Sequence, residues 1–324
     1  MNAIEVAQLT RDFKGFVAVD HISFQVKEGE IFGFLGPNGA GKTTTVKMLC
    51  TLLRPSSGSG TVAGFDIVRQ PNEVRKSMGI IFQDPSLDDR LTARENLRFH
   101  GMIYKIPRRE LPDRIQQSLE WMELVERGND LVRNFSGGMK RRLEIARGLL
   151  HSPRVLFLDE PTLGLDPQTR NRIWEYLLKL RQEHKITLFM TTHYMDEAEY
   201  CDRIAIIDHG KIVALDTPEM LKEGVGGDML DLKTDNDPQT EQELKAKYGI
   251  VAQRYEQGLC FEVKNGAGEI PVLVRELSAK VLSVSVRRPT LDDVFLKLTG
   301  REIRDDGASN RDKLKGFVKR THRT

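Results

Sequence analysis

Short apolar runs recur along the chain up to about residue 220, with helical patterns between them. The runs are continuous rather than alternating, and the clearest are Ile31–Leu35, Val155–Leu158, Ile186–Met190 and Ile204–Ile207. Strands of a parallel sheet are buried on both faces and therefore read as continuous apolar runs. The pattern predicts an α/β fold built on a parallel sheet.

A polar, charge-rich stretch over about residues 84–134 interrupts this rhythm of strands and helices. Within it, apolar side chains recur at helical spacing at Ile115, Leu119, Met122 and Val125. We therefore expect an inserted helical subdomain over about residues 84–134.

A second group of elements follows residues 223–228, where the sequence EGVGGD is typical of a flexible linker. Beyond the linker the pattern predicts a strand at 229–233, a helix at 237–249, a hairpin of 250–255 and 259–263, a helix at 270–279 and a strand at 281–286. We expect a first domain over residues 1–224 and a small accessory α/β domain over residues 225–302.

Residues 303–324 are expected to form a basic tail. The final fourteen residues carry six Lys or Arg side chains and one Asp. A solvated tail and a contact with a membrane surface are both open interpretations. The solvated tail is favoured, because one short basic run gives weak membrane attraction.

Charge and composition limit the kind of partner. The chain of 324 residues carries 49 Lys and Arg against 47 Asp and Glu, a net charge of +2. A dedicated nucleic-acid binder needs a broad basic face, so nucleic acid is not an expected partner. No apolar stretch approaches the ~18 residues that span a bilayer, so work at a membrane would require another subunit to span it.

Residues 36–43 read GPNGAGKT, which matches the phosphate-binding pattern G-x-x-x-x-G-K-[ST] between an apolar run and a helical pattern. The glycines let the backbone turn its N–H groups around phosphate oxygens. Lys42 would neutralise the β- and γ-phosphates, and the Thr43 hydroxyl would bind Mg²⁺. A glycine-rich turn that only begins a structural helix is the alternative.

Residues 155–160 read VLFLDE, an apolar run that ends in two carboxylates. Ligands of open α/β sheets bind at the carboxyl ends of the strands. Asp159 would hold Mg²⁺, and Glu160 would act on the attacking water as a base. His193 follows another apolar run and would sense the γ-phosphate, although a structural role is open. Gln83 would complete the Mg²⁺ or water site, and a plain turn residue is its alternative.

Residues 136–138, SGG, precede a helical pattern and form a second candidate anion site. Backbone N–H groups at a helix start and the helix dipole both favour a negative charge. A simple N-cap is the alternative. The apolar face of this helix consists of Met139, Leu143, Ala146 and Leu150.

These motifs occur together in an order that resembles the ATP-binding subunits of ABC transporters, over residues 1 to about 220. The matching segments are GPNGAGKTT for Walker A, Gln83 for the Q-loop, FSGGM (135–139) for the signature, VLFLDE for Walker B, LGLD (163–166) for the D-loop and His193 for the switch histidine. The resemblance implies a P-loop NTPase fold of the ABC ATPase type, with ATP and Mg²⁺ bound.

The resemblance also implies roles for individual residues. Catalytic roles fall to Lys42, Gln83, Glu160 and His193, and metal binding to Thr43, Gln83 and Asp159. Phe13 falls where the family stacks an aromatic ring on adenine, and burial in the core is its alternative. The implied nucleotide contacts are Phe13, Gly36, Pro37, Asn38, Gly39, Ala40, Gly41, Lys42, Thr43, Thr44, Ser136, Gly137, Gly138 and Asp166.

In this family two ATP-binding domains face each other head to tail. The resemblance therefore implies that Ser136, Gly137 and Gly138 cap the ATP held by a second ATPase subunit, expected to be a copy of this chain. FSGGMKRRL and residues 287–301, RRPTLDDVFLKLTGR, resemble the daunorubicin-type drug-resistance exporters. Residues 287–301 also predict an amphipathic helix that begins after Thr290.

The implied function is ATP hydrolysis that energises export of a drug-like or lipid-like substrate. The export would run through a separate membrane permease, with this chain at the cytoplasmic face of the membrane. A soluble ABC-type ATPase that acts without a permease is the alternative. It is disfavoured because the chain has one cassette and no sustained heptads. The resemblance implies regulation or subunit contact for the accessory domain.

Overall fold

The structure of the protein is a computed structural model, which describes residues 1–84, 86–255, 258–264 and 266–300. Its contacts divide it into two compact units, Met1–Asp216 and Thr217–Thr324. This division precedes the linker because α8 (Pro218–Glu223) packs against α11 (Leu291–Thr299) of the second unit. The basic tail expected over residues 303–324 lies outside the described residues.

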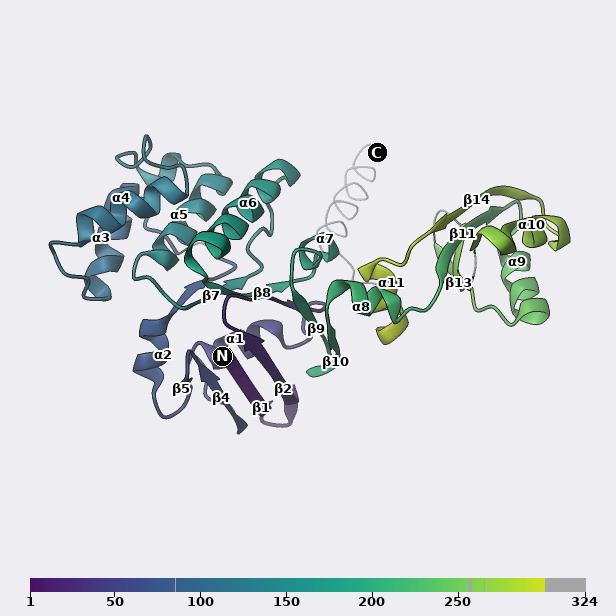
Figure 1. The fold of residues 1–324 in the computed structure, drawn as a ribbon, viewed down its shortest axis with the longest axis horizontal. Coiled ribbons are helices and arrows are strands. Elements are labelled where there is room, and N and C mark those ends of the chain that lie inside the picture. The colour runs from purple at the N-terminus through teal and green to yellow at the C-terminus, as the bar shows by residue number, and fades with distance from the viewer. Residues whose placement is uncertain (85, 256–257, 265, 301–324) are drawn as a thin grey trace, which may run out of the picture. The chain divides into compact units, whose positions relative to one another are not determined.

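The first unit is built on a six-stranded sheet with the order β10-β9-β3-β8-β7-β6. Figure 1 labels four of these strands, β7, β8, β9 and β10. The strands of this sheet pair in parallel, except that β10 is antiparallel to β9. The four predicted strands are confirmed as β3, β7, β8 and β9, so the carboxyl ends of β3, β7 and β8 share one edge. The bounds are β3 (Ile31–Leu35), β6 (Met78–Ile81), β7 (Val155–Asp159), β8 (Thr187–Thr192), β9 (Arg203–Asp208) and β10 (Lys211–Asp216).

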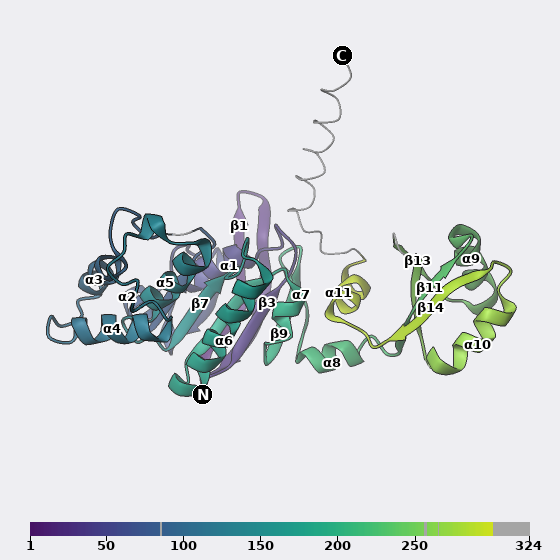
Figure 2. The ribbon, with the colours of Figure 1, turned by 90° about the horizontal axis from the view of Figure 1, so that it is seen from above.

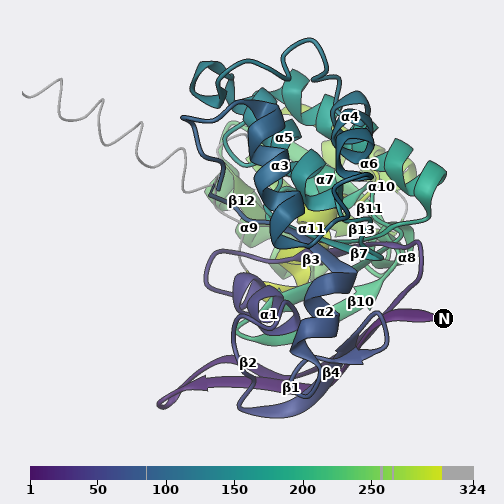
Figure 3. The same cartoon turned by 90° about the vertical axis from the view of Figure 1, so that its left-hand side faces the viewer.

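A second, antiparallel sheet lies below the first, and α1 (Lys42–Leu49) contacts strands of both sheets (Figure 3). Its order is β2-β1-β4-β5. Phe24 of β2 stacks on Phe32 of β3 with ring centroids 5.4 Å apart, within the core between the sheets. The strands are β1 (Asn2–Phe13), β2 (Phe16–Lys27), β4 (Ser57–Val62) and β5 (Phe65–Asp66).

Helices α3 (Ala93–Ile103), α4 (Leu111–Trp121) and α5 (Gly137–Leu149) pack on one another, beyond one end of the six-stranded sheet (Figure 1). The helical spacing expected to continue to Val125 ends early. α4 stops at Trp121, because Glu123 adopts a left-handed backbone with φ 51°. The remaining helices of this unit are α2 (Pro71–Ser77), the 3₁₀ turn Val132–Asn134, α6 (Pro167–His184) and α7 (Met195–Ala198).

The second unit holds an antiparallel sheet of order β12-β13-β11-β14, with helices α9 and α10 beside it (Figure 2). Apolar side chains of β11, β13 and α10 form its core. The strands expected at 229–233, 259–263 and 281–286 and the hairpin pairing are confirmed, and α11 begins after Thr290 as expected. The strand expected from residue 250 begins only at Gln253, and the helix expected at 270–279 begins and ends earlier, at Gly266 and Glu276. The bounds are β11 (Asp228–Thr234), α9 (Asp237–Glu243), the π-helix Leu244–Tyr248, β12 (Gln253–Tyr255), β13 (Gly258–Val263), α10 (Gly266–Glu276) and β14 (Val281–Arg287).

Within the described part of the chain, we find no helix whose length and apolar character would let it cross a bilayer.

Candidate functional site

The phosphate loop joins the end of β3 to the start of α1, so the predicted strand–loop–helix order is confirmed. Gly41 has φ 108°, and a Cβ atom built on it would lie 2.5 Å from the Ala18 carbonyl oxygen. At Gly36 a Cβ atom would lie 2.3 Å from the Ile207 carbonyl oxygen. Both positions therefore require glycine. Asn38 and Gly39 are exposed at the tip, Ala40 is buried, and Pro37 and Thr44 are half-buried.

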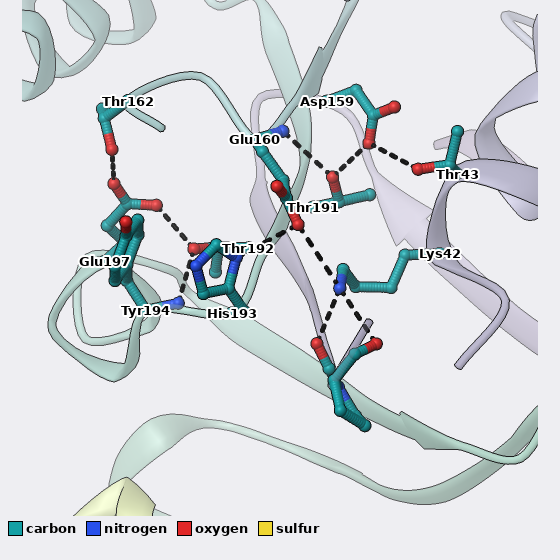
Figure 4. A network of polar contacts seen from close by, with 12 residues as sticks. Lys42, Thr43, Asp159, Glu160, Thr162, Thr191, Thr192, His193, Tyr194 and Glu197 are labelled. Atoms are coloured by element: carbon teal, nitrogen blue, oxygen red, sulfur yellow. Dashed lines mark hydrogen bonds and ion pairs between the residues drawn. The ribbon is translucent and has the colours of Figure 1, made fainter. Parts of the chain in front are cut away.

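Lys42 begins α1 and folds back over the loop (Figure 4). Its Nζ atom donates to the carbonyl oxygens of Gly36 (2.7 Å) and Pro37 (3.2 Å) and lies 3.5 Å from Oε1 of Glu160. Burial lowers the pKa of the ammonium group, although the charges of Glu160 and Asp159 oppose this shift. A buried cation among carbonyl oxygens and helix N–H groups is a site that an anion completes.

Asp159 ends β7 and receives hydroxyl donors from two other elements. Its Oδ1 atom accepts from Oγ1 of Thr191 (2.6 Å) in β8 and from Oγ1 of Thr43 (3.3 Å) in α1. The carboxylate is 2% exposed. The predicted metal residues Thr43 and Asp159 are thus adjacent, and both offer the oxygen ligands that Mg²⁺ prefers.

Glu160 follows in a left-handed backbone conformation with φ 48°. Such a conformation costs a non-glycine residue about 1–2 kcal/mol. The Glu160 backbone N–H donates to the Thr191 carbonyl oxygen (3.2 Å) and to Thr191 Oγ1 (3.1 Å), which hold this turn. Strain of this kind is typical of functional sites.

The Glu160 side chain meets His193, which follows β8 directly. Nδ1 of His193 lies 3.1 Å from Oε1 of Glu160, and both residues are 9% exposed. Burial acts to raise the pKa of Glu160. The His193 hydrogen bond and the Lys42 charge outweigh it, so the pKa lies below its ordinary value. Glu160 is therefore held as a carboxylate, which a general base must be.

Two further residues of this network were not predicted from the sequence. Thr191 contacts both acids, and its only signal was its place in LFMTTH, two residues before His193. Glu197 of α7 is buried and accepts hydrogen bonds from Thr162 and from Thr192, the latter at 2.6 Å (Figure 4). Burial raises the pKa of Glu197, against these hydrogen bonds. Glu197 thus fixes the turn that carries His193.

The structure does not bring Gln83 and Phe13 into this network. Gln83 is exposed, two residues beyond β6, and has no hydrogen bond to Thr43 or Asp159 in the described structure. Phe13 ends β1 with its ring 43% exposed and the Arg11 guanidinium 4.4 Å from the ring centroid. The alternative that Phe13 is part of the core is therefore wrong.

The signature residues form the exposed start of α5. Ser136 is the N-cap, and its hydroxyl accepts from the Met139 N–H (3.3 Å). A Cβ atom on Gly138 would lie 2.5 Å from Cγ2 of Thr169, so this end of α5 packs closely on α6. Asp166 is the N-cap of α6, and its carboxylate accepts hydrogen bonds from the N–H and the hydroxyl of Thr169. These hydrogen bonds lower the pKa of Asp166. Ser136, Gly137 and Asp166 are all exposed.

Comparison with known proteins shows the family of this chain. The ABC transporter family model matches residues 19–163. The linearmycin resistance ATP-binding protein LnrL of Bacillus subtilis (strain 168) is 40% identical over 308 residues, 89% of this chain and 95% of LnrL. The daunorubicin/doxorubicin resistance ATP-binding protein DrrA of Streptomyces peucetius is 37% identical over 313 residues, 94% of each chain.

A solved structure agrees with the fold. The ATP-binding cassette MJ0796, a dimer in a post-hydrolysis state bound to ADP and Pi, superposes with a TM-score of 0.60 and 27% identity. The match covers 66% of this chain and 98% of MJ0796. The predicted P-loop NTPase fold is thereby confirmed. The chain belongs to the ATP-binding subunits of ABC transporters, which bind and hydrolyse ATP.

Proposed function

We propose that two ATP-binding subunits, both copies of this chain, close head to tail over ATP and energise export through a separate membrane permease. The substrate would be drug-like or lipid-like, and the chain would work at the cytoplasmic face of the membrane. The observation that carries the proposal is the meeting of Lys42, Glu160 and His193 at the carboxyl edge of the sheet. There, the Lys42 ammonium group, the Glu160 carboxylate and the His193 ring lie next to one another beside the phosphate loop.

Mg²⁺ is the cofactor that this site fits. Thr43 Oγ1 and Asp159 Oδ1 lie 3.3 Å apart and are hard oxygen donors. Gln83, on the neighbouring strand end, would join them through its amide oxygen. Bound Mg²⁺ would neutralise charge on the β- and γ-phosphates.

The chain's own residues account for the hydrolytic step. Lys42 would exchange its loop carbonyl contacts for phosphate oxygens. Glu160 would take a proton from a water molecule whose oxygen bonds to the γ-phosphorus, as the bond from that phosphorus to the bridging oxygen breaks. The products are ADP and phosphate. His193 would orient the Glu160 carboxylate and the γ-phosphate.

The exposed signature supports a dimer. Ser136 and Gly137 carry a helix N-terminus that is accessible to an anion from outside the subunit. The dimeric state of MJ0796 with ADP and Pi supports the same arrangement. ATP would then join the two subunits, and its hydrolysis would release them.

An exposed apolar stripe on α3 supports a permease contact. Phe99, Met102 and Ile103 share one face of the helix and are 61%, 63% and 59% exposed. Clustered apolar surface of this kind marks an interaction site. The names of LnrL, a linearmycin resistance protein, and DrrA, a daunorubicin/doxorubicin resistance protein, support a drug-like substrate.

ATP turnover and subunit association test this proposal. Glu160→Gln removes the base and keeps the shape of the side chain. We expect turnover to fall by about 10²–10⁴-fold and the variant to form a dimer with ATP. A variant that stays monomeric with ATP, beside an inactive wild type, would contradict the proposal. ATP turnover that membranes containing the permease never alter would favour the soluble ATPase instead.

A further inference from the structure

Three charged side chains follow one another along α5, the helix that begins beside Ser136. Arg141, Glu144 and Arg147 are spaced by three residues, so they are neighbours on the helix surface. Arg141 is 6% exposed and Glu144 is 0% exposed. Oε2 of Glu144 accepts from Nη1 of Arg141 (3.1 Å), and its Oε1 lies 3.9 Å from Nη2 of Arg147. Two cations thus enclose one buried anion, as buried charges require.

The Arg141 guanidinium binds backbone carbonyls at the ends of two neighbouring strands. Beyond β7 it donates to the carbonyl oxygens of Pro161 (2.5 Å) and Glu160 (3.1 Å). Beyond β6 it donates to that of Phe82 (2.6 Å), the residue before Gln83. One side chain therefore fixes both the backbone turn at Glu160 and the start of the segment that follows β6 and carries Gln83, called the Gln83 segment below. Lysine lacks the planar fork of donors that these contacts use.

Glu144 and Arg147 hold the other side of the Gln83 segment at Ser86. The Ser86 N–H donates to Oε1 of Glu144 (2.8 Å). Arg147 donates to the Ser86 carbonyl oxygen (2.6 Å) and to its hydroxyl (2.5 Å). Gln83 is exposed, but Phe82 and Ser86 on either side of it are anchored to the same helix.

We propose that Arg141, Glu144 and Arg147 are positioning residues that tie the signature helix to the Glu160 turn and the Gln83 segment of the same subunit. This inference rests on the proposed head-to-tail dimer. In that dimer the start of α5 contacts the partner's nucleotide, while Glu160 and Gln83 act on the subunit's own. A shift of α5 on closure would therefore move the Glu160 turn, and the two nucleotide sites would be coupled through one helix.

The test compares Arg141→Lys with Arg142→Lys in the full chain. Arg142 is the matched control, because it lies on the same helix but donates to the Met122 carbonyl oxygen and to Tyr176. The readouts are kcat, the Kd for ATP with Mg²⁺, and the melting temperature. A merely structural role would move stability and ATP affinity together with kcat.

We expect Arg141→Lys to lower kcat by about 10- to 100-fold, the cost of misplacing a catalytic group by about 1 Å. The Kd for ATP should change by less than about threefold, because the phosphate loop is untouched. Arg142→Lys should leave kcat unchanged. In the Glu160→Gln background, Arg141→Lys should lower the residual turnover by a smaller factor than in the wild type, because the part of its effect that acts through the Glu160 side chain is already lost.

Two results would overturn the inference. One is equal kcat for Arg141→Lys and Arg142→Lys. The other is a parallel loss of melting temperature, ATP affinity and kcat in Arg141→Lys, which would indicate a packing role. Failure of the dimer itself would appear separately, as a Glu160→Gln parent that does not associate with ATP.

Discussion

Nδ1 of His193 lies 3.1 Å from Oε1 of Glu160, at the point where the strand ends of β7 and β8 meet. The hydrogen bond lowers the pKa of Glu160, against the effect of burial. In the proposed mechanism the two residues form one unit, in which His193 orients the Glu160 carboxylate and, together with the Lys42 charge, keeps it ionised.

His193→Ala should move the acid limb of the kcat profile to higher pH. Without the hydrogen bond, burial acts on Glu160 with less opposition, so its pKa rises and the base is protonated at pH values where it was a carboxylate. Steady-state hydrolysis across pH measures this shift. His193→Gln, which keeps an amide donor, should shift the limb less. Superimposable acid limbs for wild type and His193→Ala would contradict the role given to this pair.

Thr191→Val should lower turnover, because it removes the hydroxyl that joins Asp159 to the Glu160 N–H. The loss of these hydrogen bonds should also destabilise the fold by about 1–3 kcal/mol. Thr187→Val is a matched control, since Thr187 lies in the same strand and accepts from the Gly29 N–H at the opposite end. The Thr187→Val variant should lose stability but keep the kcat of the wild type. Equal turnover in both variants would refute the prediction.

Phe13→Ala should weaken ATP binding by about 1–3 kcal/mol, the range for one stacked base. The ring has one face under Arg11 and is 43% exposed, so a face remains accessible to adenine. Phe16→Ala is the control, because Phe16 lies across the β1–β2 turn and is 66% exposed. Titration with ATP measures both. An unchanged Kd in Phe13→Ala would remove Phe13 from the nucleotide site.

Replacing the α3 stripe should separate ATP hydrolysis from coupling. Phe99→Asp with Met102→Lys should leave turnover of the isolated chain unchanged, since no described contact links these side chains to the phosphate loop. Stimulation of turnover by membranes that contain the permease should be lost. Val251→Asp, at a position 75% exposed in the second unit, is the control. Retained stimulation in the α3 variant would place the permease contact elsewhere.

The sequence predicted the parallel strands because complete burial leaves a continuous apolar run, as in Ile31–Leu35. It missed the antiparallel sheet of β1, β2, β4 and β5. The pairing of β1 with β2 shifts register at several points between Asn2 and Asp12, and the apolar positions of β1 do not alternate regularly. Those of β2 do alternate, with Ile22, Phe24 and Val26 buried, so this strand carried a signal that the sequence interpretation overlooked. The apolar pattern of α4 continues to Val125, but the helix ends at Trp121 because Glu123 adopts a left-handed backbone conformation.

Candidate site residues were recognisable where a motif fixed their type and spacing, as for Lys42 and Glu160. Thr191 and Arg141 were not. Arg141 is one of several basic residues in MKRR, and only the fold shows that it turns inward to backbone carbonyls while Arg142 turns to α4 and α6. Such roles depend on tertiary contacts that local patterns do not encode.

The most direct test of the head-to-tail dimer mixes two variants of the chain, both of which also carry Glu160→Gln. In a head-to-tail dimer, Lys42 of one subunit and Ser136 of the other serve the same ATP. Lys42→Ala and Ser136→Arg should therefore each stay monomeric with ATP. An equal mixture should yield dimers by light scattering, because one of the two sites in each mixed pair is intact. A mixture that stays monomeric, while the Glu160→Gln parent dimerises, would contradict the head-to-tail arrangement.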